Sequence, residues 1–330
     1  MGFGIRIAVA AALVATAVRA STPGTSGTRD TFVFQNNFWV NLHHVLDAES
    51  HRREARAPLR VRLEELAAAE RDPWAAALDA YRVHAQHDRL FDPALVRLDN
   101  ALALVPSDAP LPVTLDGADA NTRRALTSAA PIYRAHYWAA QRELNDRWIA
   151  ALQPLLAEHR EAMIAAIETA YGVRWPAQPI LVDASAEAPP FGGYTIAGPP
   201  GTAGHTVIEA ANPEYQGDMA FEMLFHEASH ASAIGGRLID AIRAAAERRH
   251  VDAPRDLWHV VIFYTAGEAA RRVLGKTADA RYVPYAYRYD VYSRGWQPLR
   301  DAVVRDWQPH LDGTVTFDAA IEAIVRDTTR

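Results

Sequence analysis

The chain has 330 residues, of which 49% are hydrophobic and 22% are charged. These proportions are typical of a folded globular protein, so the composition excludes disordered and collagen-like classes and fits one or two domains. With 34 basic against 40 acidic side chains, a net charge of −6, the chain lacks the basic surplus of a nucleic-acid-binding protein.

The first twenty residues have the pattern of a signal peptide. Arg6 supplies a positive start, residues 7–18 form an apolar run, and Ala20 stands at the predicted cleavage position. The run is shorter than the roughly 20 apolar residues that a membrane-spanning helix needs. We therefore expect cleavage after Ala20 and export to the periplasm or out of the cell. We expect no membrane span in the mature chain.

Cysteine is absent from the sequence. The exported protein must therefore be stabilised by its hydrophobic core, without disulfides. The absence also excludes thiol catalysis and cysteine-ligated metal sites. Any metal ion must be held by His, Asp or Glu.

After the signal peptide, residues 21–175 are expected to form a helical N-terminal region. Phe38, Leu42 and Val45 share one helical face at a period of 3.6 residues. Further helices are predicted at residues 61–70, 74–87 and 121–171. Gly172 is expected to end the last of them.

Residues 176–330 are expected to form a second region, which begins with a small sheet. Three short segments bounded by Pro or Gly predict its strands: residues 179–182, 193–196 and 205–208. Helices follow, the first beginning after residue 212 and ending at Gly235-Gly236, and the others at residues 237–249, 254–274, 293–306 and 316–327. The predicted fold class is α+β, predominantly α, with a small β-sheet.

The first helix after these strands contains the only obvious catalytic motif, His226-Glu227-x-x-His230. One helical turn separates the two histidines, so both imidazoles can bind one tetrahedral zinc ion. Glu227 lies on an adjacent face and can act as a general base toward a water molecule on that metal. This chemistry suits attack on a carbonyl carbon.

A strand followed by a helix with this motif, and then by a helix with a carboxylate, resembles the zincin metallopeptidases. The resemblance covers residues 180–274, and in its glutamate-ligand branch the third zinc ligand is a Glu on a downstream helix. Residues 265–270 resemble that element, which implies Glu268 as the third ligand and one Zn²⁺ per chain. Arg272 departs from the branch, because thermolysin-like proteins have an Asp at that place.

Three other residues are also candidates for the third ligand: Asp240, His250 and His259. His259 lies nine residues before Glu268, about half a turn out of phase on one continuous helix, so both cannot face the metal equally. We favour Glu268, because the small residues beside it would allow its helix to approach the motif helix closely. The metzincin pattern is excluded, since Ala233 and Gly236 occupy the places of its glycine and third histidine.

The sequence also leaves several candidates for the group that stabilises the oxyanion, the negative oxygen that develops when the carbonyl is attacked. Candidates are Tyr264, His259 and the tyrosines of residues 282–292. The pair His43-His44, in the first predicted helix, is interpreted as ordinary packing.

The sequence therefore predicts an exported zinc metallopeptidase that acts on peptide or protein substrates and uses His226, His230 and Glu268 as ligands and Glu227 as base. One alternative is a non-catalytic exported binding or scaffold protein with a degenerate zincin site. Another is a di-iron helical protein, because Glu227-x-x-His230 and Glu247-x-x-His250 both match the ligand pattern of such bundles.

Overall fold

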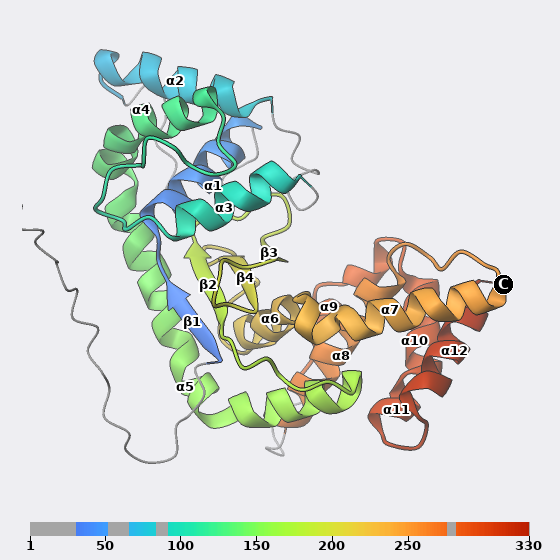
Figure 1. The fold of residues 1–330 in the computed structure, drawn as a ribbon. Coiled ribbons are helices and arrows are strands. Elements are labelled where there is room, and N and C mark those ends of the chain that lie inside the picture. Colours follow the sequence, from blue (N-terminus) through green and yellow to red (C-terminus); the bar gives the residue numbers. More distant parts are fainter. Residues whose placement is uncertain (1–30, 52–65, 84–91, 276–281, 330) are drawn as a thin grey trace, which may run out of the picture.

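The structure is a computed structural model that describes residues 31–51, 66–83, 92–275 and 282–329, so the predicted signal peptide lies outside the described residues. Figure 1 shows helices around a small central sheet. The elements in chain order are β1 (Phe32–Gln35), α1 (Phe38–Ser50), α2 (Ala68–Tyr81), α3 (Pro93–Ala103), α4 (Ala120–His136), α5 (Trp138–Tyr171), β2 (Ile180–Ser185), β3 (Gly193–Ile196), β4 (Gly204–Glu209), α6 (Asp218–Ala228), α7 (Ser232–Arg249), α8 (Leu257–Leu274), α9 (Tyr285–Arg288), η3 (Val291–Ser293), α10 (Gln297–Asp306), α11 (Gln308–Leu311) and α12 (Phe317–Thr328).

The sheet has the strand order β1-β2-β4-β3. Strands β1, β2 and β4 run parallel, whereas β3 is antiparallel to β4 and forms an edge of the sheet. The predominantly helical α+β fold class is confirmed, and the three predicted strands are present as β2, β3 and β4.

Strand β1 was not expected, because the sequence predicted only helices between residue 31 and Gly172. Phe32, Val33 and Phe34 are aromatic or β-branched residues that favour an extended backbone, and they pair in parallel with the start of β2. The helix begins only after Asn37, whose side chain accepts hydrogen bonds from the first backbone N–H groups of α1. The helical N-terminal region therefore contributes one strand to the sheet.

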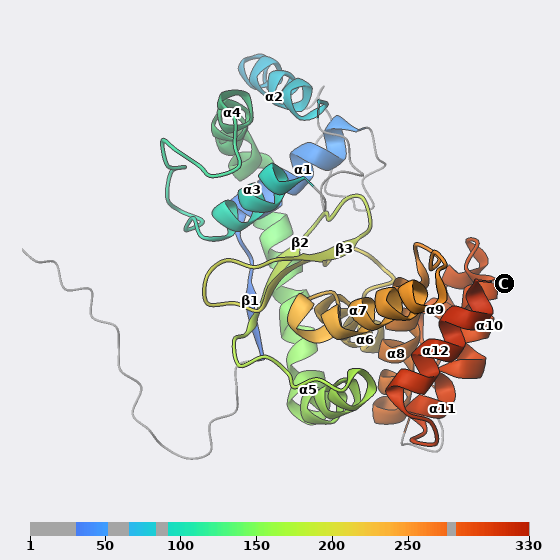
Figure 2. The ribbon, with the colours of Figure 1, turned by 45° about the vertical axis from the view of Figure 1, so that its right-hand side comes forward.

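The two faces of the sheet pack against different helices, as Figure 2 shows from a second side. Ile180 and Val182 point into a core that includes side chains of α5, α6 and α8. Leu181 and Val207 point the other way, into a core formed with α1, α2, α3 and α4. This alternation follows from the two-residue period of a strand, and it places chemically different side chains on the two faces.

Several helix boundaries differ from the prediction: the tract expected at residues 121–171 is divided at Tyr137 into α4 and α5, and two other differences involve Pro and Gly. Helix α2 continues through Pro73, which is its sixth residue and so removes a hydrogen bond close to the start of the helix. Gly235 and Gly236 lie inside α7. Gly235 is needed there, because a Cβ atom would lie 2.0 Å from the carbonyl oxygen of Ser229, just after α6. Gly172 ends α5 in a left-handed conformation, as predicted.

Within the described part of the chain, every helix is too short or too polar to span a bilayer.

Candidate metal centre

The two histidines of the motif meet at the end of α6. His226 lies in the last turn of this helix, and His230 follows its end, where the backbone N–H of His230 donates to the carbonyl of Glu227. Their Nε2 atoms are 3.2 Å apart. The last turn is thus tightened to i→i+3 hydrogen bonding, and it still brings both rings to one place, as the sequence predicted.

The third member of the group comes from α8. The ring centroid of His259 lies 5.4 Å from that of His226 and 5.0 Å from that of His230. One ligand nitrogen from each of the three rings lies within 4.8 Å of the others, a spacing that can hold a metal ion. We refer to His226, His230 and His259 as the three-histidine group.

Aromatic side chains hold these rings in place. Phe263 packs on His226 with ring centroids 3.8 Å apart, and Trp258 contacts His230 edge-on. Trp296 contacts His259 and is itself oriented by a 3.0 Å hydrogen bond from Nε1 to Asp256. The rings are therefore positioned by packing before any ligand is considered.

Burial keeps the three imidazoles neutral. His226 is buried, and His230 and His259 are half-buried with their rings packed among aromatic side chains. Because this desolvates the charged form, the pKa of His230 falls to about 3 and that of His259 to about 4, and the pKa of His226 falls well below its usual value. A metal ion binds the neutral imidazole, so this environment suits ligands. His226 Nδ1 is buried without a hydrogen-bond partner among the described residues. Three neutral histidines match the protein ligands of an open, catalytic zinc site.

The carboxylate of Glu227 lies under the edge strand β3. Thr195 Oγ1 donates a hydrogen bond of 3.4 Å to Glu227 Oε2. A Cβ atom on Gly193 would lie 3.0 Å from Glu227 Oε1, so a glycine leaves room for the carboxylate. Burial raises the pKa of Glu227 to about 8, and a nearby divalent cation would favour its ionised form.

Glu268, the predicted third ligand, is not brought to the motif. It lies nine residues after His259 in the continuous helix α8, which puts it on the opposite side of that helix and about 13 Å further along. Its carboxylate accepts hydrogen bonds of 3.0 and 3.1 Å from Arg271 Nε. Within the described part of the chain, the residue that the structure brings to His226 and His230 is His259.

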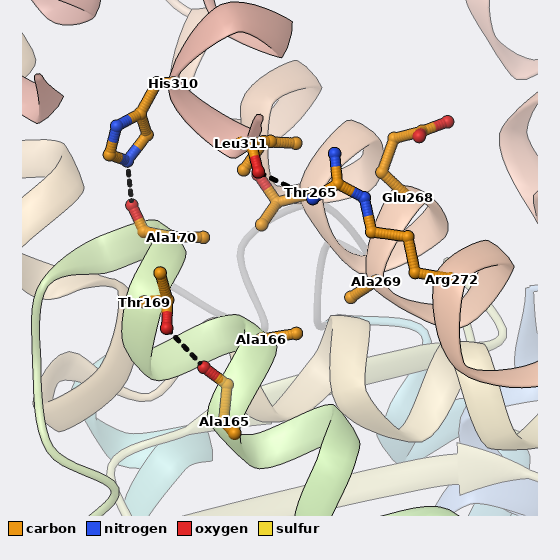
Figure 3. A pocket seen from close by; sticks show the side chains of 10 residues that line it. All are labelled: Ala165, Ala166, Thr169, Ala170, Thr265, Glu268, Ala269, Arg272, His310 and Leu311. Atoms are coloured by element: carbon orange, nitrogen blue, oxygen red, sulfur yellow. Dashed lines mark hydrogen bonds between the residues drawn. The ribbon is translucent and has the colours of Figure 1, made fainter. Parts of the chain in front are cut away.

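Glu268 instead borders a hollow between α5, α8 and α11. Figure 3 shows this hollow, which is lined by Ala165, Ala166, Thr169, Ala170, Thr265, Glu268, Ala269, Arg272, His310 and Leu311. His310 Nε2 is 2.9 Å from the carbonyl oxygen of Ala170, and Arg272 donates to that of Leu311. These polar groups serve the packing of the helices.

The structure also places the candidates for stabilising the oxyanion differently with respect to the motif. Tyr264 donates to Gln308 with a 2.5 Å hydrogen bond, on the side of α8 that carries Glu268. Tyr285 lies closer to the motif, because its ring stacks on that of Phe263 and contacts that of Tyr215. Burial is the largest cause of the raised pKa of Tyr215, and the negative charge of Glu227 is the next largest. Sequence reasoning did not single out Tyr215, which has no motif around it.

Two other sequence features lie elsewhere. Glu247 and His250 are at the far end of α7, about 22 Å and about 27 Å along that helix from its start beside the motif, so the two Glu-x-x-His pairs do not meet. His43 and His44 are buried on the opposite face of the sheet.

Comparison with known proteins found no match: no protein family fits the chain, and no curated protein and no solved structure is significantly similar to it. The function is therefore argued from the geometry of the three-histidine group and Glu227.

Proposed function

We propose that this protein is a zinc-dependent hydrolase that cleaves peptide bonds. The observation that supports this most is the three-histidine group, whose ligand nitrogens converge within 4.8 Å, together with the buried carboxylate of Glu227, the residue that follows His226. The proposal keeps the chemistry of the zincins, with His259 as third ligand in place of the glutamate of the glutamate-ligand branch.

The three-histidine group would hold the ion through neutral imidazole nitrogens. Zn²⁺, when bound there, supplies the Lewis acid that makes water nucleophilic near neutral pH and polarises a carbonyl group. The hydrophobic packing of Phe263, Trp258 and Trp296 restricts the imidazoles to one arrangement, which lowers the entropy lost on binding.

Glu227 is the general base of the proposed reaction. Its carboxylate accepts a proton from water as the water adds to the carbonyl carbon, and it later returns this proton to the leaving amine. Thr195 orients the carboxylate through Oε2. The small residue Gly193 leaves Oε1 unobstructed by a side chain.

The edge strand supports a peptide as the substrate. Gly192 O accepts a hydrogen bond from Glu209 N, so the alternation of antiparallel pairing directs the backbone groups of Gly193 and Thr195 away from β4. An extended peptide can add to such an edge through backbone hydrogen bonds. A substrate strand bound there would pass directly beside Glu227.

Export remains part of the proposal, on the strength of the first twenty residues of the sequence. The protein is expected to act in the periplasm or outside the cell after cleavage behind Ala20. The N-terminal sequence of the protein recovered from its native host tests this, because Ser21 should be the first residue.

Hydrolysis of an unstructured protein such as casein tests the proposed function. Activity should stop when a chelator removes the metal and return when one equivalent of Zn²⁺ is added. Glu227→Gln should bind zinc normally and lose at least a hundredfold in kcat, since the base is removed and the ligands are not. Glu247→Gln is the matched control, because it changes the other Glu-x-x-His pair at the far end of α7 and should keep full activity.

Full activity of Glu227→Gln with bound metal would disprove the mechanism. Zinc binding without hydrolysis of any peptide substrate would favour the alternative function, an exported protein that binds a metal without catalysing a reaction.

A further inference from the structure

Strand β3 has a different environment on each face. On the face toward α6, Thr195 donates a hydrogen bond to Glu227, and a Cβ atom on Gly193 would point at the same carboxylate. Tyr194, between them, points through the other face of the sheet into the core formed with the N-terminal helices. A single short strand therefore joins the proposed base to the helical N-terminal region.

The hydroxyl of Tyr194 is fixed by two buried side chains from that region. It lies 2.7 Å from His44 Nε2 on α1 and 3.0 Å from Asp99 Oδ2 on α3. The ring of His44 also stacks on that of Tyr194 with an interplanar angle of 26°. All three side chains are at most 2% exposed.

These partners are fixed in turn. His44 Nδ1 lies 2.7 Å from the carbonyl oxygen of Val40 one turn earlier in α1, so this nitrogen is the donor. His43 Nε2 lies 3.2 Å from Asp99 Oδ1, and its Nδ1 is 2.7 Å from the hydroxyl of Tyr81 on α2. The network thus connects β3 with α1, α2 and α3.

An edge strand needs such an anchor more than an inner strand does. Strand β3 is four residues long and, among the strands that the structure describes, pairs only with β4. Since Thr195 donates to the carboxylate of Glu227 and Gly193 leaves the space that this carboxylate fills, a displacement of β3 would displace the base as well. Rate constants are sensitive to this, because a misplacement of about 1 Å can cost a hundredfold in rate.

We infer that Tyr194 is a positioning residue, through which Asp99, His44 and the N-terminal helices hold β3, and with it Glu227, in the geometry that hydrolysis requires. This inference rests on the proposed function, and it gives the N-terminal helices a role in catalysis although they contribute no metal ligand.

The test compares Tyr194→Phe with Tyr133→Phe. Tyr133 is a matched control, because it is buried in the same core and its hydroxyl makes a 2.5 Å hydrogen bond to Gln141, away from β3. In Tyr194→Phe, the two β3 amides that pair with β4, at residues 194 and 196, should exchange with deuterium at least tenfold faster, and kcat should fall ten- to a hundredfold. Zinc content should stay at the wild-type value, and KM should change less than threefold. Tyr133→Phe should leave exchange in β3 and kcat within twofold of wild type.

Equal exchange rates in β3 for the two variants would overturn the inference, and so would a rise in KM with unchanged kcat, which would assign Tyr194 to substrate binding. Asp99→Asn is a second variant that keeps the tyrosine and should act in the same direction if Tyr194→Phe does not fold. If the wild-type protein hydrolyses no peptide, the proposed function fails, whereas hydrogen exchange still decides whether Tyr194 fixes β3.

Discussion

Replacement of Glu222 by glutamine should make the protein less sensitive to alkaline pH. Glu222 lies one turn before His226 in α6 and is 1% exposed. Its carboxyl oxygens accept hydrogen bonds from the backbone N–H of Tyr285, at 3.0 and 3.1 Å, and from the hydroxyl of Tyr282, at 2.6 Å. It therefore holds the segment that precedes α9 against the motif helix.

The expected effect follows from the pKa of Glu222. Burial raises this pKa from 4.5 to about 7, against the lowering effect of Tyr282 and the Tyr285 backbone, and the charge of Glu268 raises it slightly. Because the folded state holds the proton more tightly than the unfolded state, the free energy of unfolding falls as the pH rises from 4.5 through about 7. At about 1.4 kcal/mol per pKa unit, the loss attributable to Glu222 is about 3.5 kcal/mol over the whole range, and about 2.5 kcal/mol of it falls between pH 5 and pH 8.

Urea unfolding at pH 5 and at pH 8 measures this effect. Glutamine has nearly the same shape and can accept from Tyr285 N, but it does not titrate. The difference in unfolding free energy between wild type and Glu222→Gln should therefore shift by about 2.5 kcal/mol in favour of the variant between these pH values. Groups that titrate equally in both proteins cancel in this difference. The same difference at pH 5 and pH 8 would refute the reasoning.

Two further predictions concern glycines. Gly193→Ala should lower kcat about tenfold with zinc content unchanged, because the new Cβ would lie 3.0 Å from Glu227 Oε1; undiminished kcat would contradict this account of β3. Gly235→Ala should destabilise the protein by about 1–3 kcal/mol in urea unfolding, because its Cβ would meet the carbonyl oxygen of Ser229. Gly236→Ala should stabilise it by about 0.5–1 kcal/mol, since the nearest atom is 3.8 Å away and alanine favours a helix. Effects of the same sign at both positions would argue against the packing described for the start of α7.

The sequence was sufficient to predict the local parts of the site. Strands β3 and β4 are short runs bounded by Pro or Gly, so their positions follow from turn chemistry. The meeting of His226 and His230 follows from their separation of four residues. These predictions depend on neighbours in the chain, which a single sequence shows directly.

The parts that were missed depend on contacts between distant segments. Strand β1 is four residues long, and its partner β2 begins near residue 180, so no local pattern indicates the pairing. The small residue Gly267 does permit a close approach, as expected, but to Pro284 and to Glu222 on α6. Helix α8 therefore approaches α6 at two places, near Glu222 through Gly267 and near His226 through His259. The sequence does not show which of these places lies beside the metal ligands.

The zinc content of three purified proteins tests the central claim most directly. Wild type and Glu268→Gln should each bind one Zn²⁺ per chain with similar affinity in a competition titration against a chromophoric chelator. His259→Ala should bind it at least a hundredfold more weakly, because one of three imidazole ligands is lost. Retention of zinc by His259→Ala together with its loss from Glu268→Gln would contradict the three-histidine group as the metal centre.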